Sequence, residues 1–60
     1  MRIVHVDTGR QMRGGQWQVL FLHEGLLRAG HESLLLAPAG SPLLDETRAR
    51  GLPARSLSFA

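Results

Sequence analysis

The stretch from Thr8 to Gly15 places the strongest constraint on how this chain folds. It reads TGRQMRGG and joins a short apolar run over residues 3–6 to an apolar, helix-like segment that begins near Gln16. A strand, a glycine-rich turn and a helix start form an anion site in that order. The first N–H groups of a helix are unpaired, and the helix dipole favours negative charge there. Because Gly14 and Gly15 lack a Cβ, they let a ligand approach the backbone closely.

Apolar periodicity and turn residues predict five elements along residues 1–60. Strands are expected over residues 2–7, 32–37 and 54–59, and helices over 16–29 and from Pro42 until Gly51 ends the second helix. The order is β-α-β-α-β with short connections. Because crossover connections are right-handed, this order predicts a single α/β domain, a Rossmann-like half-domain. It would contain a three-stranded parallel sheet in the spatial order 3-2-1 and two helices.

The first predicted helix carries two neighbouring apolar stripes. They comprise Trp17, Leu20, Phe21 and Leu27, and then Val19, Leu22, Leu26 and Ala29. A face this wide predicts a helix that is largely buried against the sheet. Gly25 lies inside this helix and costs about 1 kcal/mol relative to alanine, which a close helix–strand contact would justify. Gly30 is expected to provide the left-handed C-terminal cap, and Ser41 is expected to cap the second helix.

Size and composition predict one small domain without the disulfides or thiolate metal sites that often stabilise small domains. A chain of 60 residues buries only about 60% of the surface that its unfolded form exposes. It contains no cysteine, so neither a disulfide framework nor a thiolate zinc site is available. The predicted last strand has nothing after it. We therefore expect either the N-terminal piece of a larger protein or a piece that self-association completes.

Charge and hydropathy exclude several classes of partner. The net charge is only +2, and all seven basic residues are scattered arginines, so the basic stripe of a nucleic-acid surface is missing. No apolar run approaches the ~20 residues of a membrane span. Asp7 and Arg10 interrupt the apolar core that a signal peptide would need. We expect a cytoplasmic protein, with peripheral binding at the inner membrane face as the alternative.

Two common phosphate-binding loops do not fit the glycine-rich stretch. The dinucleotide pattern G-x-G-x-x-G is absent, and Ala37-Pro38 stands where an acidic residue would hold a ribose. Gly9 and Gly14 have the separation of a P-loop, but Gly15-Gln16 replaces the lysine and serine or threonine that bind phosphate and magnesium. The pattern therefore disfavours both an NAD(P) or FAD site and nucleotide hydrolysis by a P-loop.

The chain resembles the start of a family-4 glycosyltransferase along essentially all of its length. The resemblance lies in a strand that ends near Asp7-Thr8, the pair Gly14-Gly15, and a long helix that closes on Gly30-His31-Glu32 before an aliphatic strand. It continues through residues 37–42 and through Gly51-Leu52-Pro53. The resemblance rests on the combination of these motifs in this order and not on the Gly-Gly pair alone.

The resemblance implies a two-domain GT-B enzyme of which this chain is the N-terminal, acceptor-side part. The missing C-terminal domain would bind the nucleotide-sugar donor and would carry the family's paired glutamates. The acceptor would be a glycan, a lipid-linked sugar or a small molecule. No cofactor beyond the nucleotide sugar is implied, and no metal-ligand spacing is present. By the same resemblance, Gly14 and Gly15 would face the interdomain cleft, near the donor's diphosphate and the transferred sugar.

Candidate cleft residues are Thr8, Arg10, Arg13, Gly14 and Gly15, and none of them is assigned a catalytic role. For each one a structural interpretation stands beside the functional one, because the glycines suit a tight turn, the arginines suit a solvated loop and Thr8 suits local hydrogen bonding. Asp7 is expected mainly to fix the loop by accepting backbone N–H bonds. His5, His23 and His31 are interpreted as structural. Trp17 is interpreted as core or cleft wall, with contact to a sugar as the lesser alternative.

Two classes of function remain open. The first is the enzyme part just described, which would not be competent alone. The second is a non-catalytic α/β binding or assembly module that forms a homo-oligomer through exposed sheet edges. Another GT-B enzyme, such as a nucleotide-sugar epimerase, would share the same N-terminal architecture.

Overall fold

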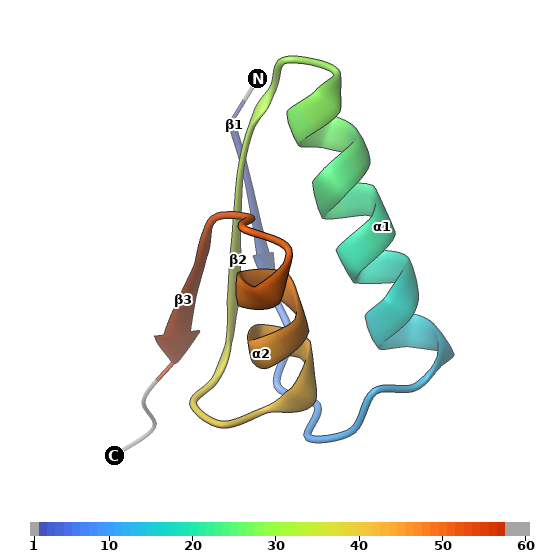
Figure 1. Cartoon of the computed structure of the whole chain (residues 1–60), viewed down its shortest axis with the longest axis vertical. Helices are drawn as coiled ribbons and strands as arrows, with labels where there is room; N and C mark the ends of the chain where they lie inside the picture. The colour runs from blue at the N-terminus through green and yellow to red at the C-terminus, as the bar shows by residue number, and fades with distance from the viewer. Residues whose placement is uncertain (1, 58–60) are drawn as a thin grey trace.

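The computed structural model describes residues 2–57 and shows a small α/β fold (Figure 1). Its elements are β1 (Arg2–Val6), α1 (Gly14–Arg28), β2 (Glu32–Pro38), α2 (Pro42–Ala49) and β3 (Ala54–Leu57). The three strands form one parallel sheet in the order β1-β2-β3, which is the order 3-2-1 viewed from the opposite edge. The predicted fold class is confirmed. The part of the third predicted strand over residues 58–59 lies outside the described residues.

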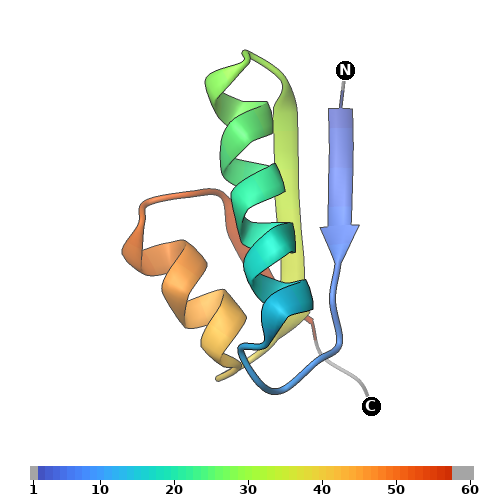
Figure 2. The same cartoon turned by 90° about the vertical axis from the view of Figure 1, so that its right-hand side faces the viewer.

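Both helices cover the same face of the sheet (Figures 1 and 2). Along β2, Ser33, Leu35 and Ala37 are buried beneath the helices, whereas the alternate residues Leu34 and Leu36 are only half-buried. This alternation follows from the strand geometry, which directs successive side chains to opposite faces. The fold therefore has two layers, with β2 at the centre of the sheet.

The apolar core lies between β2 and the two helices. It consists of Leu20, Leu35, Ala37, Leu43 and Leu44. Leu43 and Leu44 of α2 lie in this core, and their position depends on where that helix begins. The Oγ of Ser41 accepts a hydrogen bond from the backbone N–H of Leu44 at 3.3 Å, and Pro42 occupies the first helical position. The predicted N-cap is confirmed.

Helix α1 differs from its prediction at both the N-terminus and the buried face. It begins at Gly14, two residues before the predicted start. Only Leu20 and His23 are buried, while Phe21 and Leu22 are 54% and 55% exposed. The prediction of a wide buried face is therefore wrong, because α1 packs mainly on β2 and beside α2, so only a narrow stripe of the helix meets the sheet. The C-terminal cap is confirmed: Gly30 has a φ of 88°.

Gly25 has no packing role in α1. No heavy atom that could be a packing neighbour lies within 4 Å of the position that a Cβ would take there. The predicted close helix–strand contact at this glycine is wrong.

The second face of the sheet is apolar, and no described element covers it. Val4 and Val6 of β1 are 53% and 62% exposed, and they pair with Leu34 and Leu36 on the same face. Parallel sheets are normally covered on both faces. This surface, defined by Val4, Val6, Leu34 and Leu36, is called the open face below.

A chain of hydrogen bonds connects β1, β2, α1 and the segment that leads into β3. The Oγ of Ser33 lies 2.6 Å from Nδ1 of His23 and 3.0 Å from Nε2 of His5. Nε2 of His23 lies 2.8 Å from the carbonyl oxygen of Pro53. His23 is fully buried, so all its partners are within the protein.

The direction of each hydrogen bond in this network can be assigned by starting from the carbonyl of Pro53. A carbonyl oxygen only accepts, so Nε2 of His23 donates to Pro53. In the neutral ring Nδ1 is then an acceptor, and the Ser33 hydroxyl donates to it. The Ser33 oxygen in turn accepts from Nε2–H of His5. With both rings neutral, every hydrogen bond in the chain is made.

We expect the free energy of unfolding to fall as the pH is lowered below 6.5. Burial of the imidazole, and after it the nearby His23 ring, lowers the pKa of His5 from its ordinary value of 6.5. The unfolded chain therefore binds more protons in this range, and the stabilisation present above pH 6.5 is lost as the pH falls through the lower folded pKa. Urea unfolding from about pH 7.5 to about pH 5 measures the effect.

His5→Gln can keep the hydrogen bond to Ser33 without titrating, so it should flatten this dependence. His31→Gln serves as the control, because His31 lies outside the network, and it should leave the dependence unchanged. An equally steep fall in the His5→Gln variant would contradict the assignment.

Candidate functional site

The loop over residues 7–13 lies at the carboxyl edge of the sheet, at the bottom of Figure 1. The turn after β2 and the N-termini of α1 and α2 lie at the same edge. Open α/β sheets bind ligands at the carboxyl ends of their strands. This edge is therefore the place where the fold assembles a candidate site.

Asp7 and Gln16 hold the loop between the end of β1 and the first turn of α1. The N–H of Asp7 continues the ladder by bonding to the carbonyl of Leu36 at 3.0 Å. Its Oδ1 accepts from the N–H of Gly9 at 2.7 Å, as in an Asx turn. Nε2 of Gln16 donates to the two Asp7 carboxylate oxygens at 3.3 and 3.5 Å, and its Oε1 accepts from the N–H of Arg13 at 3.2 Å.

The role expected of Asp7, fixing the loop by accepting a backbone N–H bond, is confirmed. The clamp by Gln16 was not predicted. The only sequence signal for it is a glutamine three residues after the helix N-cap, where such side chains often reach back to the N-cap backbone.

The structure brings only some of the predicted site residues together. An open depression of about 270 Å³ is lined by Gly9, Arg10, Gln11, Arg13 and Gln16. Both predicted arginines therefore border it. Thr8, Gly14 and Gly15 are exposed close by in the chain but do not line it.

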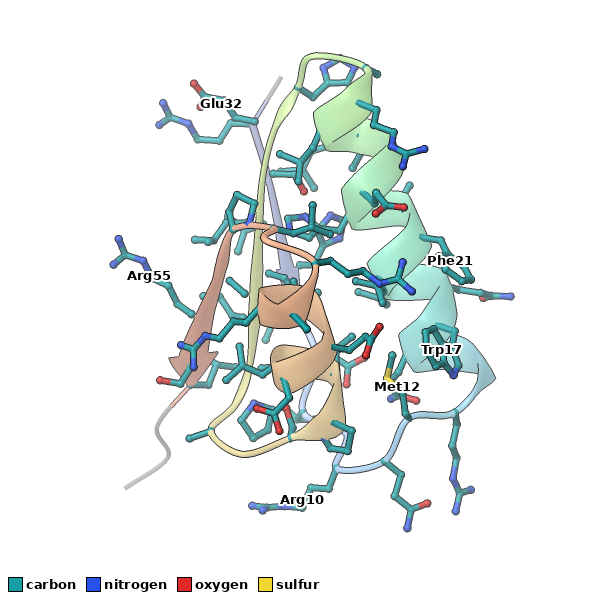
Figure 3. The ribbon with its side chains drawn as sticks, viewed as in Figure 1. Arg10, Met12, Trp17, Phe21, Glu32 and Arg55 are labelled. Carbon is teal, nitrogen blue, oxygen red and sulfur yellow. The ribbon has the colours of Figure 1, made fainter. Side chains whose placement is uncertain are left out.

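The two arginines of the depression are arranged differently. Arg10 is exposed and extends away from the body of the fold (Figure 3). Arg13 is the N-cap residue of α1, and its Nε donates to Oε1 of Gln11 at 2.8 Å. Both side chains leave positive charge in solvent at the depression, and Arg13 does so at the positive end of the helix dipole. This corner of the molecule is suited to an anion.

Gly14 and Gly15 occupy the first turn of α1 without any conformational need for glycine. Among the described residues, positive φ angles occur at Gly30, Gly40 and Gly51 and not at this pair. No packing neighbour lies within 4 Å of the position that a Cβ would take at either residue. A tight turn is therefore not the reason for these glycines, and the space above the backbone is open.

Comparison with known proteins identifies no relative of this chain. No family model matches the chain, and no curated protein or solved structure matches it significantly. Neither helix within residues 2–57 has the length and apolar character required to cross a bilayer. The residues and their geometry carry the functional proposal that follows.

We expect Gly14→Ala and Gly15→Ala each to raise the free energy of unfolding by a few tenths to about 1 kcal/mol, because alanine restricts the unfolded chain and favours the helix. Urea unfolding measures the change. Gly51→Ala is the control: its φ of 71° is unfavourable for a residue with a Cβ, so this variant should be less stable. A destabilised Gly14→Ala or Gly15→Ala would show that the fold itself requires the glycine.

Proposed function

We propose that this chain is the N-terminal part of a glycosyltransferase that moves a sugar from a nucleotide-sugar donor to an acceptor. The observation that carries the proposal is the open space over Gly14 and Gly15 at the start of a helix, at the carboxyl edge of a parallel sheet. Glycines that the fold does not require, at a helix start that attracts anions, favour close approach by a ligand.

The chemistry of this corner suits a leaving nucleotide. When the bond to the transferred sugar breaks, negative charge develops on the diphosphate. Backbone N–H groups of the first turn of α1, with Arg13 at the N-cap and Arg10 on the depression, would stabilise that charge. The loop is already held in place by Asp7 and Gln16, so little reorganisation is needed when charge develops there.

The rest of the proposed reaction lies outside this chain. A C-terminal domain would supply the main donor site and the paired glutamates, so the chain alone is not expected to catalyse transfer. The acceptor would be a glycan, a lipid-linked sugar or a small molecule. The cytoplasmic location and the association with an inner membrane face belong to the same proposal.

Nucleotide-sugar binding is testable in the 60-residue chain by NMR. We expect UDP-glucose, GDP-mannose or ADP-glucose to shift the backbone amide signals of Gly14, Gly15 and Gln16, because those N–H groups would face the diphosphate. Gly15→Val should weaken binding at least tenfold. Gly25→Val is the matched control, since it adds the same side chain to the same helix at a second open position and should leave the affinity unchanged.

Two outcomes would contradict the donor-cleft assignment. One is binding of a nucleotide sugar that shifts other amides of the chain but not these three. The other is an equal loss of affinity in Gly15→Val and Gly25→Val.

The open face favours a second candidate function, a module that assembles with copies of itself. Val4 and Val6 expose apolar surface next to Leu34 and Leu36, and within residues 2–57 the outer edges of β1 and β3 have no strand beside them. An unpaired edge and an uncovered apolar face are both covered when chains associate.

Sedimentation distinguishes this candidate. If the open face mediates assembly, the chain should sediment as an oligomer, and Val6→Lys should shift it to monomer, because Val6 is 62% exposed. Trp17→Lys is the control for exposed apolar surface on the helical side and should leave the oligomer intact. A stable, compact wild-type monomer would contradict the assembly function.

A further inference from the structure

An aromatic and charged cluster lies on the outer surface beside the candidate site. The rings of Trp17 and Phe21 are stacked, with centroids 5.8 Å apart and planes inclined by 30°. The guanidinium carbon of Arg50 lies 5.9 Å from the Trp17 centroid and 5.8 Å from that of Phe21. Arg50 comes from the C-terminal end of α2, so the cluster spans both helices.

Two carboxylates hold Arg50 in this position. Its Nε bonds to Oε1 of Glu46 at 3.1 Å, and its Nη1 lies 3.8 Å from Oε2 of Glu24. The arginine side chain is 31% exposed, and both carboxylates lie against it. A planar donor group and two acceptor groups therefore lie together around the two rings before any ligand arrives, and this partial ordering lowers the entropic cost of binding.

The aromatic rings are accessible. Trp17 is 36% exposed and Phe21 is 54% exposed, and neither belongs to the core. Figure 3 shows both side chains on the part of α1 that faces away from the strands. Trp17 follows Gln16 directly in the chain, and Gln16 lines the depression of the candidate site. The cluster therefore lies on the same helix as Gln16, although none of its residues lines the depression.

These groups match the surface of a sugar ring. A pyranose presents an apolar C–H face, which packs on aromatic rings, and a rim of hydroxyl groups that both donate and accept hydrogen bonds. Glu24 and Glu46 would accept from hydroxyls, and Arg50 would donate to them. A hydrocarbon chain would leave the charged rim unused, and the carboxylates would repel the phosphates of a nucleotide.

We propose that Trp17 and Phe21, with Arg50, Glu24 and Glu46 at their rim, form a binding subsite for a pyranose ring of a saccharide acceptor. The inference rests on the proposed function and deepens it. Among the three classes of acceptor that the sequence leaves open, it favours the two that carry a sugar ring, a glycan or a lipid-linked sugar, over a small molecule without one.

The chain contains a single tryptophan, so its fluorescence reports on this cluster alone. We expect maltotriose, chitotriose or mannotriose to change the emission of Trp17 saturably, with a millimolar dissociation constant, whereas glycerol should cause no saturable change. Phe21→Ala should weaken sugar binding at least tenfold. Leu22→Ala is the matched control, because Leu22 is the next residue on α1 and is equally exposed, at 55%. Its affinity should be unchanged.

Several results would overturn the subsite. They are no saturable change with any of the three trisaccharides, equal loss in Phe21→Ala and Leu22→Ala, or an emission that depends on protein concentration without sugar. The last result would make the cluster an interface between copies. Nucleotide-sugar shifts at Gly14 and Gly15 are measured independently of Trp17 emission. If the chain gives those shifts but binds no trisaccharide, the subsite is contradicted and the proposed function is not.

Discussion

The hydrogen bonds of His23 are the interaction on which the rest of this fold depends. The ring is fully buried and joins α1 to Ser33 of β2 and to the carbonyl of Pro53, immediately before β3. Only five apolar side chains form the fully buried core of the described residues. Hydrogen bonds that join three segments therefore contribute a large share of what holds these segments together. Loss of the ring would leave buried groups unpaired, at about 1–3 kcal/mol for each. Within residues 2–57 no buried side-chain nitrogen or oxygen lacks a partner.

Two separate sets of interactions hold the helices and the loop at the carboxyl edge. The histidine network and the core hold the helices against β2, while a separate set of bonds from Asp7 and Gln16 shapes the loop at the carboxyl edge. Met12 also packs against the core from within the loop, so both the hydrogen bonds and this apolar contact keep the loop in its geometry. Exposed groups that would meet a ligand, the first turn of α1 and the flanking arginines, are free to vary chemically without unfolding the scaffold.

Local patterns predict the order and type of the elements but not how much each is buried. Ser41 and Gly30 are recognised from sequence because capping depends on neighbouring residues. The burial of α1 is overestimated, because periodicity identifies an apolar face but not how much of the sheet lies beneath it. The bond between His23 and Ser33, and the clamp of Gln16 on Asp7, join residues from separate elements. The spacing of these pairs in sequence does not predict either contact. The place of Gln16 three residues after the N-cap predicts only its bond to the N–H of Arg13.

The position of His5 in β1 has a consequence for strand pairing. The strand is apolar on both faces, with Ile3 on the helical side and Val4 and Val6 on the other, so burial alone discriminates weakly between two alignments with β2. A slip of one residue would exchange the faces and place a valine beside the Ser33 hydroxyl. Only the observed alignment brings the imidazole within 3.0 Å of that oxygen. The hydrogen bond between His5 and Ser33 therefore favours the observed register of β1 over the shifted one.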